Sequence, residues 1–399
     1  MVKGARRPKS RDPPTLYWRR VSTRVPFNRP FVVGDELANI AEAVRSGQLA
    51  GVGAFTRRCE SRLEERFGIP RILMTSSCTA ALEMAAMLLD LQPGDEVIMP
   101  SFTFVSTASA FVRAGGRPVF VDIRDDTLNL DETEIDAAVT KRTRAIVPVH
   151  YGGIGCEMDA IIEIADRHGL TVVEDAAQAV NARYRGRALG GVGALGTFSF
   201  HETKNFICGE GGALCVNDER LIDRAEIVRD KGTNRQQFDR GQVDKYSWVD
   251  IGSSYVASEL NCAFLWSQLE QMDRITARRA SIHERYRRGL RSLAGQERLR
   301  LPHVPEDCES NHHLFHILLP DMAGRDRLMR ALHADGILAV FHYVPLHSSP
   351  MGRTLGAGST ALPVTDDVSG RLLRLPLFYD LSESDQDFVI ERVQHHLTS

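Results

Sequence analysis

The stretch EVIMPSFTFVSTASAFVRAGGRPVFVDI, residues 96–123, joins two kinds of apolar pattern. It begins with a short strand-like run, EVIMP (96–100), continues with a helical pattern, FVSTASAFVRAG (104–115), and ends with a second strand-like run, RPVFVDI (117–123). A strand, a helix and another strand in this order form a βαβ unit, in which the two strands are parallel. Strands that are apolar throughout are typical of a sheet covered by helices on both faces. The stretch therefore predicts an α/β fold.

The same alternation extends to both sides of this unit. Two helical patterns come first, from Asp35 to Gly47 and over residues 55–67. Further strands are expected at residues 71–77, 144–150, 171–175, 195–201 and 212–217, and further helices at 79–90, 131–140 and 157–169. A long helical stretch at about 258–293 precedes a region that mixes strands (312–320, 337–343) with helices (326–336, 382–396). These patterns predict a mostly parallel sheet with helices on both faces, followed by a smaller C-terminal α/β domain.

Length and composition divide the chain further. A chain of 399 residues is too long for one core, and we expect a basic disordered tail at 1–24, a large domain at 25–250, and a long helix with a small domain at 251–399. A transit peptide or a nucleic-acid arm is the alternative for the tail. A net charge of −3 and the lack of a long apolar run argue against nucleic-acid and membrane partners. Seven scattered cysteines without a C-x-x-C pair favour a cytoplasmic location.

Polar and aromatic side chains follow the expected strands. In open α/β sheets, ligands bind beyond the carboxyl ends of the strands, so these residues are expected to converge at one edge. They are Ser76, Ser77 and Cys78; Pro100, Ser101 and Phe102; His150 and Tyr151; Glu174 and Asp175; and residues 201–204, which end with Lys204.

Each of these groups has a structural and a functional interpretation. Hydroxyls at a helix N-terminus either cap the helix or bind a phosphate, and Asp175 either caps a helix or faces a cationic partner. Phe102 and Phe104 are either core residues or stack on a flat ring. A phosphate site, an aromatic ring, a buried carboxylate and Lys204 together are what pyridoxal phosphate requires. The lysine forms a Schiff base with the cofactor aldehyde, and the carboxylate keeps the pyridine nitrogen protonated.

Three other motifs are weaker candidates for a ligand-binding or metal site. GVGALG (191–196) matches a dinucleotide-binding pattern, but it precedes a strand instead of following one. NHHLFH (311–316) gathers three histidines without a cysteine or carboxylate to complete a metal site. GEGG (209–212) is either a phosphate cradle or a flexible turn after the lysine. No metal is expected.

The motifs SCTAAL, PSFTFVSTASAF, VEDAAQA and FSFHETKN resemble those of the DegT/DnrJ/EryC1/StrS sugar-nucleotide aminotransferases, and the resemblance runs from about Val25 to the C-terminus. It implies pyridoxal phosphate fold type I, with pyridoxamine phosphate as an intermediate form of the cofactor. Lys204 matches the Schiff-base lysine and Asp175 the carboxylate that faces the pyridine nitrogen. Gln178 matches the glutamine beside the ring, and Phe104 the aromatic that stacks on the cofactor.

The resemblance also implies how the phosphate is bound. Ser77, Cys78 and Thr79 match the phosphate-cradling segment, and Ser199 matches another phosphate ligand. Cys78 stands where most members have glycine. Ser254 stands where many members have an asparagine that reaches the phosphate in the neighbouring subunit, which implies a homodimer with shared active sites.

The segments SCTAALEMAA, GTNRQQFDRGQVDKY, DIGSS and AVFHYVPLH resemble one branch of this family, the dTDP-4-amino-4,6-dideoxygalactose transaminases. The resemblance implies transfer of an amino group from L-glutamate to a dTDP-linked 4-keto-6-deoxyhexose, and it leaves galacto and gluco products open. Candidate substrate contacts lie in two segments, whose alternative interpretation is a surface loop and a strand end. They are Lys231, Thr233, Asn234 and Arg235, and His342, Tyr343 and His347. The competing functions are a sugar dehydratase of the same family, which would carry histidine at position 204, and a non-catalytic binding protein.

Overall fold

The computed structural model describes residues 23–356 and 361–398, so the expected tail lies outside the described residues except for its last two positions. Within this part of the chain, a seven-stranded sheet has the order β1-β9-β8-β5-β4-β2-β3. Its strands are β1 (Arg71–Thr75), β2 (Glu96–Pro100), β3 (Arg117–Val121), β4 (Thr143–Ile146), β5 (Thr171–Asp175), β8 (Leu195–Ser199) and β9 (Gly212–Val216). β9 is antiparallel to both of its neighbours, and the other pairings are parallel. The predicted α/β fold with a mostly parallel sheet is confirmed.

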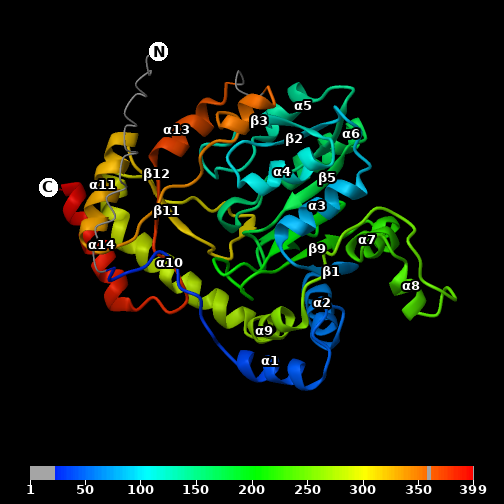
Figure 1. Ribbon diagram of the computed structural model, residues 1–399. Coiled ribbons are helices and arrows are strands. Elements are labelled where there is room, and N and C mark those ends of the chain that lie inside the picture. Colours follow the sequence, from blue (N-terminus) through cyan, green and yellow to red (C-terminus); the bar gives the residue numbers. More distant parts are fainter. Residues whose placement is uncertain (1–22, 357–360, 399) are drawn as a thin grey trace, which may run out of the picture.

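Alternate side chains of the strands enter two separate cores, one on each face of the sheet. Helices cover the sheet on both faces (Figure 1). Ile72 and Met74 pack with helices α2 (Ala54–Phe67), α6 (Met158–His168) and α9 (Glu259–Glu270). Leu73 and its cross-strand partner Leu214 of β9 point to the opposite face and pack with α3 (Cys78–Leu88), α4 (Val105–Arg113) and α7 (Ile222–Arg229). This burial on both faces explains why the strand sequences are apolar throughout.

The C-terminal region forms a third core at one side of the molecule (Figure 1). Strands β11 (Phe315–Leu318) and β12 (Leu372–Leu375) form an antiparallel pair, and α10 (Met272–Gly295), α11 (Met322–Ala334) and α14 (Glu383–Thr398) pack around it. The remaining helical elements are α1 (Glu36–Arg45), η1 (Glu132–Glu134), α5 (Ile135–Ala138), η2 (Tyr151–Gly153), η3 (Glu219–Leu221), α8 (Arg235–Asp239), α12 (Pro350–Thr354) and α13 (Pro363–Arg371). Strands β6 (Arg183–Tyr184), β7 (Arg187–Ala188) and β10 (Cys308–Glu309) form a small separate sheet.

The N-terminal end of the described chain also joins this region. Val25 forms a bridge with Ile337 and is buried in the third core, so a segment far away in sequence completes it. Among the described residues, no helix combines the length and the apolar character needed to span a membrane.

Several expected elements differ from the structure. The expected strand at 337–343 is wrong: Ile337 pairs only with Val25 and Val340 only with Arg374, so the segment links two partners and forms no ladder. The expected long helix divides at Gln271, whose φ of −105° and ψ of 17° interrupt the helix between α9 and α10. β11 begins three residues later than expected, after His312 with its φ of +54°. Strand β12 was not predicted.

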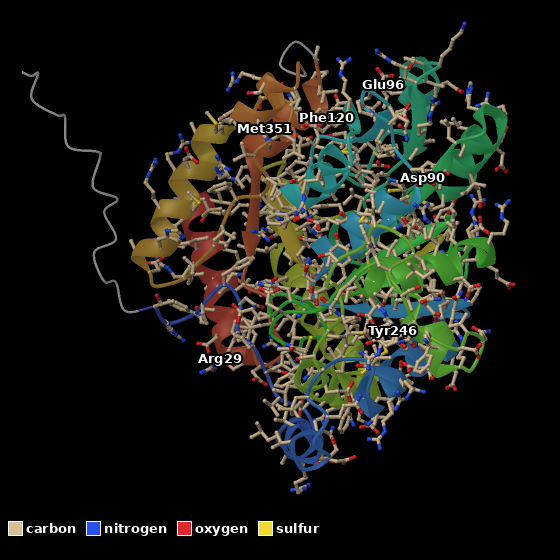
Figure 2. All side chains as sticks on the ribbon, turned by 45° about the vertical axis from the view of Figure 1, so that its right-hand side comes forward. Arg29, Asp90, Glu96, Phe120, Tyr246 and Met351 are labelled. Carbon is tan, nitrogen blue, oxygen red and sulfur yellow. The ribbon has the colours of Figure 1, made fainter. Side chains whose placement is uncertain are left out.

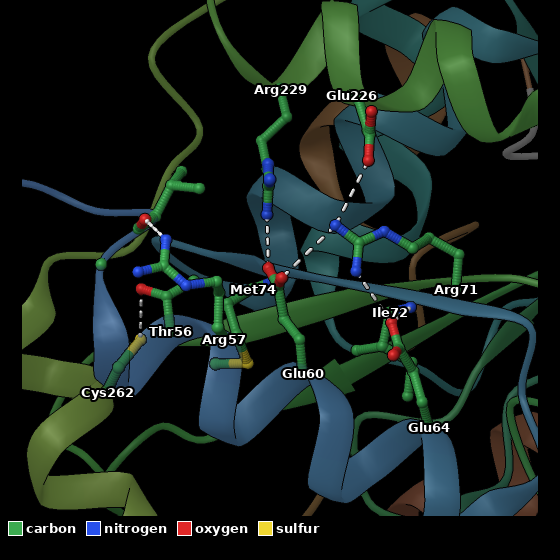
Figure 3. A network of polar contacts seen from close by, with 12 residues as sticks. Thr56, Arg57, Glu60, Glu64, Arg71, Ile72, Met74, Glu226, Arg229 and Cys262 are labelled. Carbon is green, nitrogen blue, oxygen red and sulfur yellow. Dashed lines mark hydrogen bonds and ion pairs between the residues drawn. The ribbon is translucent and has the colours of Figure 1, made fainter. Parts of the chain in front are cut away.

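A buried ionic network joins α2, β1 and α7 (Figure 3). Arg229 of α7 is fully buried and donates to Glu60 of α2 at 2.6 Å. Arg71 of β1 lies 3.5 Å from Glu60 and also pairs with Glu64 and Glu226. The network fixes the end of α7, from which the chain continues into residues 230–254.

Candidate active site

A cavity of about 830 Å³ lies where strands of the large sheet end and the small domain begins. Its wall contains Ser77 after β1, Phe104 after β2, Asp175 at the end of β5 and Lys204 after β8. The expected convergence of strand ends is confirmed for these segments. His342, Tyr343 and Arg374 of the C-terminal region also line the cavity.

The N-terminus of α3 forms one end of the cavity. Ser77 caps the helix by accepting a hydrogen bond from the backbone N–H of Ala80 at 3.1 Å, so the capping interpretation holds. Thr79 lies 2.8 Å from the Ser106 hydroxyl, and both line the cavity. A helix N-terminus attracts anions, so the same turn also fits a phosphate.

Gly212 of β9 allows the chain to pass close to this turn. A Cβ at Gly212 would lie 2.3 Å from the backbone N of Cys78 and 2.4 Å from the carbonyl carbon of Ser77. No side chain fits there without moving the first turn of α3. The GEGG motif therefore contributes a close approach to the helix N-terminus.

Asp175 presents a buried carboxylate to the middle of the cavity. Only 5% of the residue is exposed. One carboxylate oxygen accepts a 2.7 Å hydrogen bond from the Thr107 hydroxyl, and the other accepts from the backbone N–H of Ala177 at 3.1 Å. Two donors hold the carboxylate in a fixed position. Such a group suits a cationic ring nitrogen.

Lys204 lies in a tight turn after β8, where its backbone N–H donates to the His201 carbonyl at 2.9 Å. Burial lowers the pKa of the Lys204 amine, and the neighbouring Cys78 and Asp175 partly offset this effect. The positive charge of Arg374 lowers the pKa further. A lysine with a lowered pKa has more neutral amine at physiological pH, which is the form that reacts with an aldehyde.

Cys78 occupies the position expected to hold glycine in most relatives. Burial and the nearby Asp175 raise the pKa of its thiol to about 12, so the side chain is neutral at physiological pH. Thiolates are the reactive form of cysteine, and Cys78 is therefore a small, unreactive side chain in the wall.

Aromatic and amide groups line the rest of the wall. The Gln178 amide donates to the Tyr343 hydroxyl at 2.8 Å and accepts from the backbone N–H of Gly152 at 2.7 Å. Phe104 is 58% exposed and lines the cavity, so it is no core residue. The Tyr151 hydroxyl lies 3.0 Å from Nδ1 of His342.

Some expected site residues lie outside this wall. Ser254, together with the loop residues Lys231, Thr233, Asn234 and Arg235, does not line the cavity of the described chain. His347 is 3% exposed and lies against the Ser101 hydroxyl, 2.8 Å from its Nδ1, instead of facing the cavity. His342, Tyr343 and Ser199 do line the cavity.

The remaining motifs have structural explanations. The backbone N–H groups of Gly190, Val192 and Gly193 donate to Glu174, so the GVGALG segment closes a turn over a buried carboxylate. Among the described residues, no group of histidine, cysteine or acidic side chains is arranged to hold a metal. His201 lines the cavity and contacts Thr203 at 2.9 Å.

Thr107 and Arg374, which the sequence did not single out, also line the cavity, as does His313 of the NHHLFH motif. Thr107 lies one helical turn after Thr103, and the two hydroxyls are 2.9 Å apart. This spacing of two threonines was the available signal for the hydroxyl that donates to Asp175. Arg374 interrupts the apolar run LLRLPLF, at residues 372–378, with one charge.

The whole region matches one family. The model of the DegT/DnrJ/EryC1/StrS aminotransferase family aligns with residues 32–394. The chain belongs to this family. The predicted family is therefore confirmed over the region in which the motifs were found.

Solved structures with the same fold support the assignment. The aminotransferase TlmJ from Streptoalloteichus hindustanus is 32% identical, with 94% of this chain and 99% of that chain covered and a TM-score of 0.86. DesV of S. venezuelae, solved in complex with a ketimine intermediate, is 33% identical, with 95% and 100% covered and a TM-score of 0.84. The putative sugar aminotransferase Spr1654 from Streptococcus pneumoniae in its PLP form is 27% identical, with 94% and 98% covered and a TM-score of 0.86.

The cavity fits the cofactor of this family. A PMP form of Spr1654 is also known, so the prediction of pyridoxal phosphate is confirmed at the level of the family. In this chain, the cavity brings together a helix N-terminus for a phosphate, a buried carboxylate for a ring nitrogen and a half-buried lysine with a lowered pKa for an aldehyde.

Proposed function

We propose that the protein transfers the amino group of L-glutamate to a dTDP-linked 4-keto-6-deoxyhexose and releases a dTDP-4-amino-4,6-dideoxyhexose. The observation that carries the aminotransferase chemistry is that Lys204, whose pKa is lowered, lines one cavity together with the buried Asp175 carboxylate. The 4-keto position and the dTDP carrier rest on the branch resemblance of the sequence. The sugar class is supported by the likeness to Spr1654, a putative sugar aminotransferase.

The residues that line the cavity have separate roles in the proposed reaction. Pyridoxal phosphate, when bound, supplies an electron sink next to the carbon that exchanges its amino group. Asp175 would hold a positive charge on the ring nitrogen, because its carboxylate is buried and fixed by two donors. The α3 N-terminus with Ser77 and Thr79, together with Ser199, would hold the phosphate, and Phe104 and Gln178 would lie beside the ring. Lys204 takes the proton from the amino-acid Cα and delivers a proton to C4 of the sugar.

A lysine at position 204 also favours transfer over dehydration. The related dehydratases are expected to carry histidine there, which cannot form a Schiff base with an aldehyde. This makes amino transfer the proposed reaction.

We infer a homodimer in which the loop of residues 230–254 serves the neighbouring active site. The loop carries exposed apolar side chains, including Tyr246 at 54% (Figure 2), Trp248 at 79% and Ile251 at 71%. Exposed apolar groups close together favour a protein interface. Contact with a second subunit would also give Ser254 a role, since it does not line the cavity of its own chain. Seven free cysteines in the described residues agree with the proposed cytoplasmic location.

Replacement of Trp248 tests the dimer. The variant Trp248→Glu places a charge at the centre of the apolar loop, and we expect monomers by light scattering and a loss of turnover. Arg327→Glu, on the exposed face of α11, serves as the control and is expected to keep the wild-type mass. A Trp248→Glu variant that stays dimeric would contradict this interface.

The substrate class is tested with the compounds themselves. The purified protein with pyridoxal phosphate is incubated with L-glutamate and dTDP-4-keto-6-deoxyglucose, and the product is analysed by mass spectrometry and NMR. We expect an amino sugar nucleotide, and the H3–H4 coupling distinguishes a galacto from a gluco product. Failure to convert any 4-ketosugar nucleotide would reject the proposed substrate class.

A further inference from the structure

Arg374 is a single charge in an otherwise apolar strand. In β12, Leu373 and Leu375 pack into the core of the small domain. Side chains alternate along a strand, so Arg374 points to the opposite side, the side of Leu372. Leu372 packs beside Tyr151, and Arg374 lines the cavity. The strand therefore delivers one guanidinium to the wall of the proposed active site.

This guanidinium has few partners within the protein. Nη2 donates to the Phe341 carbonyl at 3.3 Å, and the group lies over the ring of Phe27 at 4.6 Å. Nε is buried without a hydrogen-bond partner. Among the described residues, no carboxylate lies within 4.0 Å of Arg374, whereas Arg371, three residues earlier, pairs with Asp367. A guanidinium carries five N–H donors in a planar fork, so most of its capacity is unused.

The positive charge of Arg374 affects two ionisable groups that line the cavity, Lys204 and His342. It lowers the pKa of the Lys204 amine and, together with burial, the pKa of the His342 imidazole. Arg374 and Lys204 both line the cavity, so the guanidinium and the lysine share one space. An anion bound by Arg374 would lie close to the carbon on which Lys204 acts.

We propose that Arg374 binds the α-carboxylate of the amino donor. This inference rests on the proposed aminotransferase function and names a residue that positions its first substrate. A carboxylate matches the planar fork of a guanidinium with two parallel hydrogen bonds. The α-carboxylate is attached to the carbon that gives its proton to Lys204. The diphosphate of a sugar nucleotide, the other available anion, is attached at C1, across the sugar ring from the reacting C4.

Three variants test the assignment. Arg374→Gln removes the charge, Arg374→Lys keeps the charge but loses the fork, and Arg371→Gln removes a nearby arginine that does not line the cavity. Binding of glutarate, an unreactive dicarboxylate, is followed by the change in the visible absorbance of the bound cofactor. Consumption of L-glutamate and of the sugar nucleotide is then followed in separate half-reactions.

We expect Arg374→Gln to bind glutarate on the order of 10- to 100-fold more weakly, the range for a lost charge-assisted hydrogen bond. The KM of Arg374→Gln for glutamate is expected to rise, and Arg374→Lys to show an intermediate effect. The half-reaction with the sugar nucleotide is expected to be unchanged in these variants, and Arg371→Gln to behave like the wild type in both half-reactions. Unchanged glutarate affinity, or an equal loss in both half-reactions, would overturn the proposal. A selective loss with the sugar nucleotide would assign Arg374 to the diphosphate instead. If the wild-type protein binds glutarate through Arg374 but does not take the amino group from L-glutamate, the proposed aminotransferase function is rejected. The assignment of Arg374 as a carboxylate-binding residue would remain.

Discussion

Lys204 and Asp175 carry the proposed chemistry because burial changes what their charged groups do. Burial lowers the pKa of the lysine amine, and two hydrogen bonds fix the aspartate carboxylate. Around them, the chain leaves little freedom for substitution. Gly212 is the sharpest example, since its missing side chain is the space in which the first turn of α3 lies.

The variant Gly212→Ala tests this close approach. The new Cβ would lie 2.3 Å from the backbone N of Cys78, and we expect a loss of about 1–3 kcal/mol in the free energy of unfolding. Affinity for pyridoxal phosphate should also fall, because the helix N-terminus must move. Gly295→Ala is the control, since nothing lies within 4 Å of the added Cβ. Equal stability and cofactor affinity of the two variants in chemical denaturation and absorbance titration would refute this role.

The sequence predicted those site residues whose position follows from local order along the chain. Asp175 ends β5 and Lys204 lies in the turn that follows β8, and strand ends meet at one edge of a sheet. Arg374 was not predicted, because its strand reaches the cavity only through the packing of the small domain. His347 was misplaced for the same reason: it follows a segment that enters the cavity but itself turns to Ser101.

At the scale of elements, periodicity predicted the strands and most helices of the large domain but not their ionic connections. Glu60 is a polar residue within the apolar face of α2, and its partners Arg71 and Arg229 lie on two other elements, β1 and α7 (Figure 3). The expected strand at 337–343 was wrong because strand-like composition does not supply a neighbouring strand. Element type depends on partners that only the tertiary structure provides.

The variant Glu60→Gln tests whether the network fixes α7 against α2. Removing one member leaves the fully buried Arg229 without its carboxylate, and we expect a loss of about 3–5 kcal/mol in the free energy of unfolding. The exposed pair between Glu42 and Arg58, at 3.5 Å, offers a matched control. Glu42→Gln is expected to cost less than about 1 kcal/mol. Similar small losses for both variants would show that the buried network contributes little.

At the scale of the whole molecule, two α/β regions meet at the cavity, and the small domain contains buried histidines. Burial lowers the pKa of His283 to about 3, with further contributions from His312 and His316. His283 packs against Phe315 with its ring at 4.8 Å. A histidine that is neutral in the folded protein but binds a proton when unfolded makes stability depend on pH.

The sign of this dependence follows from proton binding. Below about pH 6.5 the unfolded chain protonates His283, whereas the folded protein does so only near the lowered pKa, so stability falls as the pH falls. Between pH 7 and pH 5 this contribution is about 2 kcal/mol. Between pH 7 and pH 5, we expect the free energy of unfolding of His283→Phe to fall by about 2 kcal/mol less than that of the wild type, measured by urea unfolding. A variant of the exposed His303 is the control and is expected to show the same change of stability with pH as the wild type. An unchanged slope in His283→Phe would contradict the assignment.

The central claim, that Lys204 holds the cofactor, is tested most directly by locating the covalent bond. The protein is purified with pyridoxal phosphate, reduced with borohydride to make the lysine–cofactor bond permanent, digested, and analysed by tandem mass spectrometry. We predict the pyridoxyl group on Lys204 alone, and none in a Lys204→Ala variant treated in the same way. A modification on a different lysine, or an unmodified Lys204 in protein that retains the cofactor, would contradict the claim.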